Sequence, residues 1–133
     1  MLAVINHRAP STMTTGHHTM SQTICLALPL LPGTTDTERD EMMSCWQGER
    51  AEQYRASRAR HGITREATWI QSTPAGDVSI VLLESNDLSA SLFGVATSND
   101  AFDVWFRAHV QQMHGIDLAA GMNLPEPVLD HSA

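Results

Sequence analysis

One histidine lies where an acid–base residue would be expected. His109 falls in the middle of an apolar stripe with helical spacing, and the other members of that stripe are Phe102, Trp105, Phe106, Val110 and Met113. A neutral imidazole in an apolar pocket can act as a general base near pH 7. The alternative is a core histidine whose two ring nitrogens are satisfied by neighbouring groups. The sequence leaves both open; we take His109 as the catalytic candidate and Phe106 as a substrate contact.

Aromatic and polar side chains supply candidate walls for a small-molecule site. Trp46 and Trp69 can stack against a flat substrate, although core packing is the alternative for each. Glu49 and Gln53 lie one helical turn apart and would orient a substrate together if their face lined a cavity. The alternative is that this part of the helix extends into water. No catalytic triad, phosphate loop or zinc-ligand spacing occurs, so we expect neither a metal nor another cofactor.

Composition narrows the class of protein. The 133 residues have a formal net charge of −7, which argues against a nucleic-acid partner. All eight basic residues are arginine, so a lysine Schiff base is excluded. Cys25 and Cys45 are too few for a disulfide framework and are expected to be reduced. No apolar run reaches the roughly 18 residues of a membrane span, and the first residues do not resemble a signal peptide. We therefore expect a cytoplasmic protein without a membrane partner.

The pattern predicts a leader and one domain. Residues 1–20 show no periodicity and are interpreted as a disordered leader, with Met1 and Met20 both candidate start residues. Residues 21–133 are interpreted as a single domain. Its first elements are a strand over 22–30 and one long helix over 35–61. That helix would begin with a capping box of Thr35 and Glu38 and end at Gly62.

A hairpin follows, with two β-prone runs between Ile63 and Glu84 around the turn residues 74–77. Asn86 and Asp87 would cap a short helix that ends near residue 95. Ser98 would cap a helix that ends at Gly115. The tail, residues 116–133, is interpreted as a last short strand or a covering arm.

The second hairpin strand predicts a partner. Side chains alternate along a strand, so Val78, Ile80 and Leu82 share one face while Val81 and Leu83 share the other. Both faces are apolar and both need cover. The chain's own helices can cover one face, and we expect a second copy of the chain to cover the other.

Four stretches carry a resemblance to a known family. They are Cys45–Arg50, Gly62–Ala67, Trp69–Pro74 and Phe102–Arg107. With the element order, they resemble small bacterial proteins of the dimeric α/β-barrel superfamily, in particular antibiotic-biosynthesis-monooxygenase-like domains. The resemblance covers about residues 21 to 130. It implies an α+β, ferredoxin-like antiparallel sheet with helices on one face. Two such sheets would pack face to face as a homodimer, with a pocket between each sheet and its helices.

The resemblance also implies a range of functions. The first is a cofactor-independent monooxygenase-like enzyme that acts on a small apolar or aromatic substrate, with His109 as base or hydrogen-bond donor. Such chemistry requires the substrate itself to supply a stabilised carbanion, while the protein removes a proton and excludes water. The second is a non-catalytic binding or accessory protein on the same scaffold. The third is haem binding through His109, since some members bind haem.

Overall fold

The computed structural model describes residues 20–133, which form three strands, four helices and one short 3-10 turn. The predicted leader lies outside the described residues, apart from Met20. The elements in chain order are β1 (Gln22–Pro29), α1 (Thr35–Trp46), α2 (Ala51–Arg60), β2 (Ile63–Thr73), β3 (Gly76–Ser85), α3 (Leu88–Thr97), α4 (Ala101–His114) and η1 (Leu118–Ala120).

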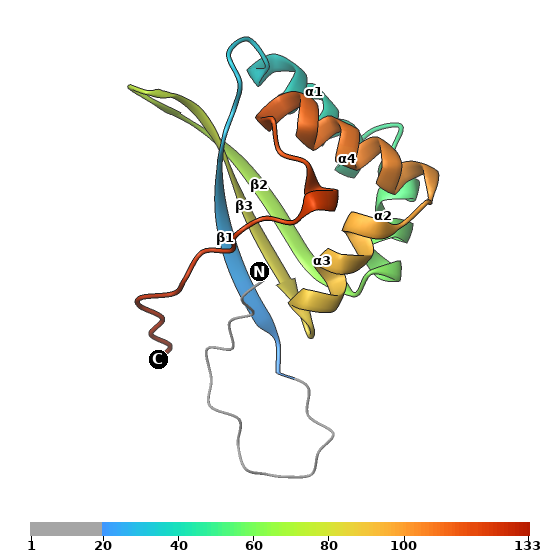
Figure 1. The fold of residues 1–133 in the computed structure, drawn as a ribbon, viewed down its shortest axis with the longest axis vertical. Coiled ribbons are helices and arrows are strands. Elements are labelled where there is room, and N and C mark those ends of the chain that lie inside the picture. The colour runs from blue at the N-terminus through green and yellow to red at the C-terminus, as the bar shows by residue number, and fades with distance from the viewer. Residues whose placement is uncertain (1–19) are drawn as a thin grey trace.

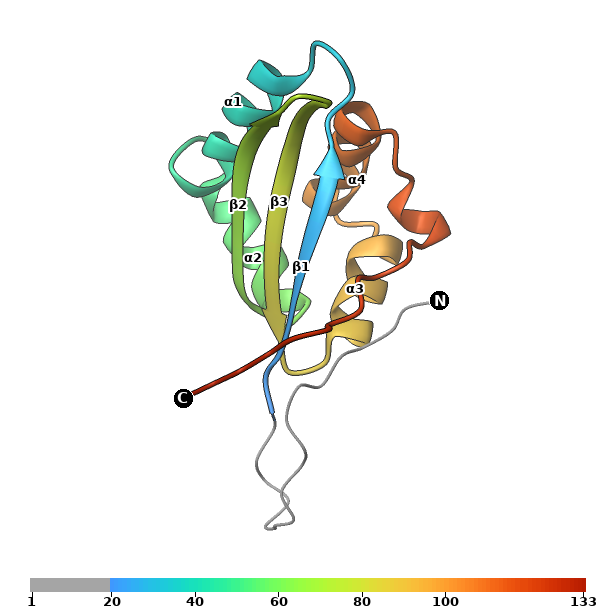
Figure 2. The same cartoon turned by 90° about the vertical axis from the view of Figure 1, so that its left-hand side faces the viewer.

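The strands form one antiparallel sheet in the order β1-β3-β2, and the helices lie on one side of it (Figure 1). β2 and β3 make the predicted hairpin, and their register pairs Thr68 with Val81. This confirms the α+β class and agrees with a ferredoxin-like arrangement. The predicted last strand does not form among residues 116–133. After η1, Met122 and Leu124 still pack against the core. The chain beyond them instead passes across the sheet on the side away from the helices, as the alternative of a covering arm predicts (Figure 2).

The core lies between the sheet and the helices. Ile24, Leu26 and Leu83 point from the strands into this layer, where Leu88 and Val95 of α3 meet them. Val81 packs against the same cluster. The face that carries Val81 and Leu83 is therefore the one that the chain's own helices cover.

The opposite face of the sheet, here called the open face, is largely apolar. The strand register places three rows of side chains side by side on it. These rows are Cys25–Leu82–Ala67, Ala27–Ile80–Trp69 and Pro29–Val78–Gln71. Trp69 remains 51% exposed. No helix lies on this face in Figure 2.

The prediction of one long helix over residues 35–61 is wrong. The chain leaves the helix after Trp46 and starts α2 at Ala51. At this break the Arg50 backbone N–H donates to the Ser44 carbonyl at 2.9 Å. A Cβ atom on Gly48 would lie 2.8 Å from the Ser44 Cα, so a larger residue would push the two segments apart. Gly48 permits this close approach of the chain to Ser44, and α2 is therefore a separate helix rather than a continuation of α1.

The helix ends match the predictions in part. Asp87 caps α3 by accepting a hydrogen bond from the Ala90 N–H, and Gly62 and Gly115 follow their helices with φ of 73° and 72°. Two predicted N-caps are wrong. α1 has Thr34 at its N-cap without a side-chain cap. The Thr35 hydroxyl instead donates to Asp77 Oδ2 at 2.7 Å, and Glu38 turns into the core. α4 is capped by Asp100 rather than Ser98. Among residues 20–133, no helix is long and apolar enough to cross a membrane.

Candidate functional site

His109 is buried between two carboxylates. Its side chain is 2% exposed, and its Nε2 lies 2.6 Å from Glu38 Oε1 while its Nδ1 lies 2.5 Å from Glu41 Oε1. Glu38 also accepts a hydrogen bond from Ser79 Oγ at 2.7 Å. Both glutamates lie on α1 at a spacing of three residues, so one helix face presents both to α4. His109 thus has a partner on each ring nitrogen.

This arrangement holds a charged pair inside the protein. Burial lowers the pKa of His109, but the hydrogen bonds to Glu38 and Glu41 outweigh it and leave the pKa raised. Burial likewise raises the pKa of Glu38, yet the bonds from His109, His114 and Ser79 bring it down to about 2. Each ring nitrogen of His109 faces a carboxylate oxygen, so the arrangement favours the imidazolium form, which donates from both nitrogens. A base needs a free lone pair, so the catalytic role of His109 stays a prediction that requires one of these bonds to open.

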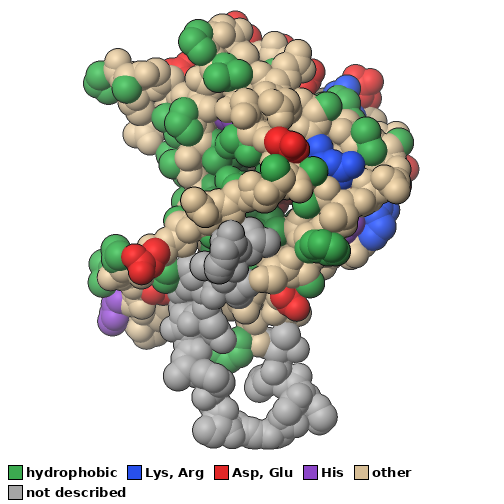
Figure 3. Space-filling view, viewed as in Figure 1, with side chains coloured by type: hydrophobic (Ala, Val, Ile, Leu, Met, Phe, Trp, Pro, Cys, Tyr) green, Lys and Arg blue, Asp and Glu red, His purple; other side chains and the backbone are tan. Residues whose placement is uncertain are grey.

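An inner cavity of about 80 Å³ lies against this pair, between the sheet and the helices. His109, Phe106 and Met42 line it together with aliphatic core residues. Figure 3 shows hydrophobic side chains gathered between the sheet and α4 on this side of the molecule. A cavity of about 150 Å³ holds benzene, so this one has room only for a few atoms.

A second buried pair forms another wall of the inner cavity. Arg58 Nε donates to Glu66 Oε1 at 2.8 Å, and the Tyr54 hydroxyl donates to the same oxygen at 2.6 Å. Burial and the charge of Glu66 raise the pKa of Tyr54, so the phenol keeps its proton. The Arg58 guanidinium also lies 4.4 Å from the centre of the Phe106 ring, which is a cation–π distance.

A larger hollow, here called the edge groove, lies between β2 and the α1–α2 pair. Its volume is about 620 Å³, within the range of about 300–1,000 Å³ that is typical of ligand pockets. Trp46 and Trp69 line it at 64% and 51% exposure, together with Met42 and Met43. β2 pairs only with β3 in the described sheet, so its other edge borders the groove. Burial raises the pKa of the Cys45 thiol to about 11, which leaves this lining residue apolar and unreactive.

The edge groove and the inner cavity are neighbours. Met42, Glu66 and Thr68 line both of them. Thr68 and Glu66 come from β2 and point toward the helices, and Met42 reaches them from α1. These three side chains form the boundary between the two hollows, called the shared wall below.

The predicted site residues therefore divide into three groups. Trp46 and Trp69 meet in the edge groove, while His109 and Phe106 meet at the inner cavity. Glu49 and Gln53 are exposed and line neither hollow. Glu49 lies in the break between α1 and α2, so the single helix face that would have brought these two together does not exist. Their role as substrate orienters stays a prediction.

Sequence reasoning missed the charged partners and the shared wall. One available signal was the helix spacing, because Glu38, Met42 and Cys45 fall on the same side of α1. Glu38 was instead assigned to a cap. The pairing of Arg58 with Glu66 had no such signal, because helix and strand residues meet there only after folding.

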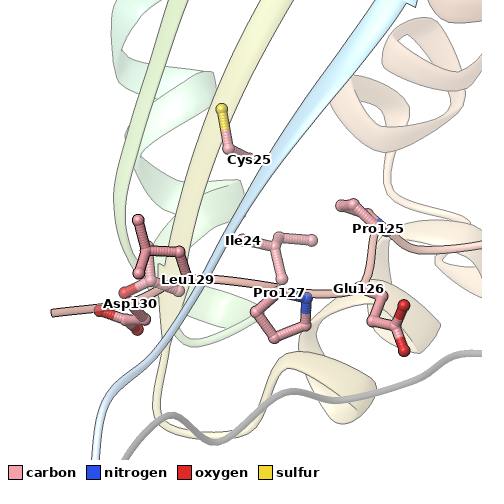
Figure 4. A pocket seen from close by; sticks show the side chains of 8 residues that line it. Ile24, Cys25, Pro125, Glu126, Pro127, Leu129 and Asp130 are labelled. Atoms are coloured by element: carbon pink, nitrogen blue, oxygen red, sulfur yellow. The ribbon is translucent and has the colours of Figure 1, made fainter.

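A third hollow, of about 310 Å³, lies where residues 125–130 cross β1 (Figure 4). Pro125, Pro127 and Leu129 border it beside Ile24 and Cys25. It shares no lining residue with the edge groove or the inner cavity. It is a gap beneath the covering arm, whose Val128 and Leu129 are 90% and 86% exposed.

The described side chains can be compared with what a metal ion and a haem need for binding. Among residues 20–133, no group of three or more histidine, cysteine or acidic side chains is arranged to hold a metal ion. Haem iron needs an imidazole nitrogen with a free lone pair, and both nitrogens of His109 are bonded to carboxylates. The inner cavity is also far smaller than a haem. The residues around His109 therefore do not fit that group.

Comparison with known proteins gives no relative. No family model matches the chain, and neither a curated protein nor a solved structure does. The function must therefore be argued from the geometry.

Proposed function

We propose that the chain is a small-molecule-binding protein that works as a homodimer and takes a planar, largely apolar ligand in the edge groove. The observation that carries the proposal is the groove itself. Its volume suits a drug-sized molecule, and two tryptophans and two methionines line it. Tryptophan offers a flat apolar face for stacking, and methionine adapts its shape to a ligand.

Exposed tryptophans also give a reason for affinity. An indole side chain buries roughly 150–250 Å² when it is covered. Trp46 and Trp69 leave more than half of their surfaces in water. Covering the exposed part would contribute about 2–4 kcal/mol for each ring, at roughly 25 cal/mol per Å². A ligand that touches both rings would thus gain an appreciable part of a micromolar binding free energy, which is about 8 kcal/mol.

The homodimer is supported by the open face. Val78, Ile80 and Leu82 form a continuous apolar row along β3 there, and residues 20–133 of the same chain place no helix over it. Exposed apolar surfaces of this kind are typical of protein interfaces. The opposite face of the sheet packs against the chain's own helices and forms the core. A second copy that presents the same surface is the simplest cover, because a two-fold interface is self-complementary.

Monooxygenase-like catalysis is a second candidate that rests on the resemblance and on His109. The shared wall places the inner cavity next to the edge groove, so a ligand atom could approach His109. His109 would first have to release Glu41, whose side chain is 29% exposed and can turn to solvent. The closed arrangement, with both nitrogens bonded, supports binding more directly than it supports proton abstraction.

Native mass spectrometry of gently purified protein tests the binding proposal. We expect a bound small molecule in the wild type and its loss in Trp46→Ala, which shortens a groove wall without touching the open face. Phe93→Ala is the matched control, because Phe93 is 66% exposed on α3 and lies outside the groove. Equal ligand occupancy in Trp46→Ala and the control would contradict the groove as the site. The dimer mass in the same spectra reports the oligomeric state separately.

A further inference from the structure

The charged side chains around the edge groove are already paired within the chain. Arg58 and Glu66 bind each other at 2.8 Å, and both are largely buried. Arg39 binds Asp36 at 2.8 Å at the rim. Behind the shared wall, His109 is held by Glu38 and Glu41. A ligand charge placed against the inner end of the groove would therefore find no free counter-charge, and a buried unpaired charge is strongly unfavourable.

Among residues 20–133, one polar group of the shared wall has no hydrogen-bond partner. The Thr68 hydroxyl forms no hydrogen bond with any residue in the described part of the chain, whereas the Tyr54 hydroxyl, which lines the same groove, is bonded to Glu66. No fully buried polar side-chain atom lacks a partner among these residues, so the Thr68 hydroxyl keeps some access to the hollow. Its place on β2, in register with Val81, directs it to the helix side of the strand. A threonine hydroxyl can both donate and accept a hydrogen bond.

We propose that the edge groove selects an uncharged planar molecule with one hydrogen-bonding group, and that the Thr68 hydroxyl binds this group at the shared wall. The proposal rests on the proposed function and adds the class of ligand and the residue that selects it. The flat part of the ligand lies against Trp46 and Trp69. Its polar group reaches inward to Thr68, since the described residues place no other unpaired polar side chain at that end.

Arg39 is the competing contact for a charged ligand. It lines the groove at its outer end, and its side chain is 53% exposed. Exposed ion pairs contribute little because water screens them. An anionic ligand at the rim would replace Asp36 as the partner of Arg39 and would gain almost no binding free energy. The formal net charge of −7 repels such a ligand further. The inner, less exposed end of the groove decides the selection.

The test uses four probes of nearly the same shape. They are 2-naphthamide (uncharged, hydrogen-bonding), 2-methylnaphthalene (uncharged, no hydrogen bond), 2-naphthoate (anionic) and 2-naphthylmethylammonium (cationic). Their dissociation constants are measured by titration calorimetry on the full-length wild type and on Thr68→Val, which keeps the shape and removes the hydroxyl. Thr68→Ser restores the hydroxyl. Thr64→Val is the control in the same strand, because Thr64 lines neither hollow.

We expect 2-naphthamide to bind at least tenfold more tightly than either charged probe. Thr68→Val should weaken 2-naphthamide three- to tenfold, as the loss of one uncharged hydrogen bond does, and leave 2-methylnaphthalene unchanged. Thr68→Ser and Thr64→Val should behave as the wild type. A thermal melt of each variant separates a folding defect from a binding defect.

Other outcomes overturn the proposal in distinguishable ways. If no probe binds, the proposed function fails together with this inference. If all four bind within threefold of one another, the groove binds planar molecules but does not select on charge, and only the inference fails. Tight 2-naphthoate binding that is lost in Arg39→Gln would assign the polar contact to the rim. Unchanged 2-naphthamide affinity in a folded Thr68→Val would remove Thr68 from the contact.

Discussion

Replacing Glu38 with glutamine tests the buried charge network most directly. The side chain of Glu38 is 3% exposed, and its pKa falls from 4.5 to about 2 in the folded chain. A carboxyl group with that difference contributes about 3 kcal/mol to the free energy of unfolding at neutral pH. Glutamine keeps the size of the side chain and an accepting oxygen but loses the charge. We expect Glu38→Gln to lower the free energy of unfolding by up to about 3 kcal/mol at pH 7.

The pH dependence of this loss has a definite sign. Because the pKa of Glu38 is lowered on folding, its contribution is complete above pH 4.5 and disappears as the pH falls toward 2. The difference in the free energy of unfolding between wild type and Glu38→Gln, here called the gap, should thus narrow to about 1.4 kcal/mol at pH 3. The pKa of His109 is raised, so its contribution is complete at low pH and is lost as the pH rises through its folded value. The lowered pKa of Glu38 and the raised pKa of His109 describe the same ion pair, so its contribution to the free energy of unfolding is counted only once.

Urea unfolding followed by tryptophan fluorescence at pH 7 and pH 3 measures the gap. Glu49→Gln is the matched control, because Glu49 is exposed, and it should change the free energy of unfolding by less than about 0.5 kcal/mol. A Glu38→Gln protein as stable as the wild type at pH 7 would refute the reasoning. So would a gap of the same size at both pH values.

Three further predictions concern packing, the second buried pair and the dimer. Gly94→Ala should lower the free energy of unfolding by about 1–3 kcal/mol in a thermal or urea melt, because its Cβ would lie 2.4 Å from His61 Nδ1. Arg58→Met should be destabilising by about 3–5 kcal/mol because it leaves Glu66 buried without its partner, and Arg58→Met combined with Glu66→Leu should be less destabilised than either single variant. Ile80→Glu should give a folded monomer in sedimentation equilibrium, because it places a charge at the centre of the open face.

Each of these has a control and a contradicting result. Ser89→Ala in the same helix should leave the stability almost unchanged, and a Gly94→Ala melt identical to it would show that His61 moves aside freely. Strict additivity of the Arg58 and Glu66 substitutions would show that the two side chains are not coupled. Val104→Glu, on the outer surface of α4, should leave the dimer intact. A wild type that sediments as a monomer at micromolar concentration would disprove the dimer.

Local sequence signals predicted most of the fold. The turn residues 74–77 between two β-prone runs gave the β2–β3 hairpin, and the alternation along residues 78–83 assigned Val81 and Leu83 to the same face. Gly62 and Gly115 marked two helix ends because glycine adopts a positive φ without strain. Each of these features depends on neighbours in the chain, which is why it can be read from the order of residues.

The candidate site was predicted less well for a physical reason. Trp46 and Trp69 were expected as walls and do meet in one groove, but Glu49 and Gln53 line neither hollow. Their assignment assumed an unbroken helix. The break depends on the close approach of Gly48 to Ser44, a tertiary detail that helical periodicity does not encode.

The amino-acid sequence by itself determined where strands, turns and helix ends form and which side chains share a face. Only the tertiary structure decided which charges meet. Glu38 and His109 are 71 residues apart in the chain, yet their side chains lie 2.6 Å apart once α1 and α4 pack on the sheet. Periodicity gives the direction of a side chain along its own element, whereas the partner across the core depends on how separate elements dock.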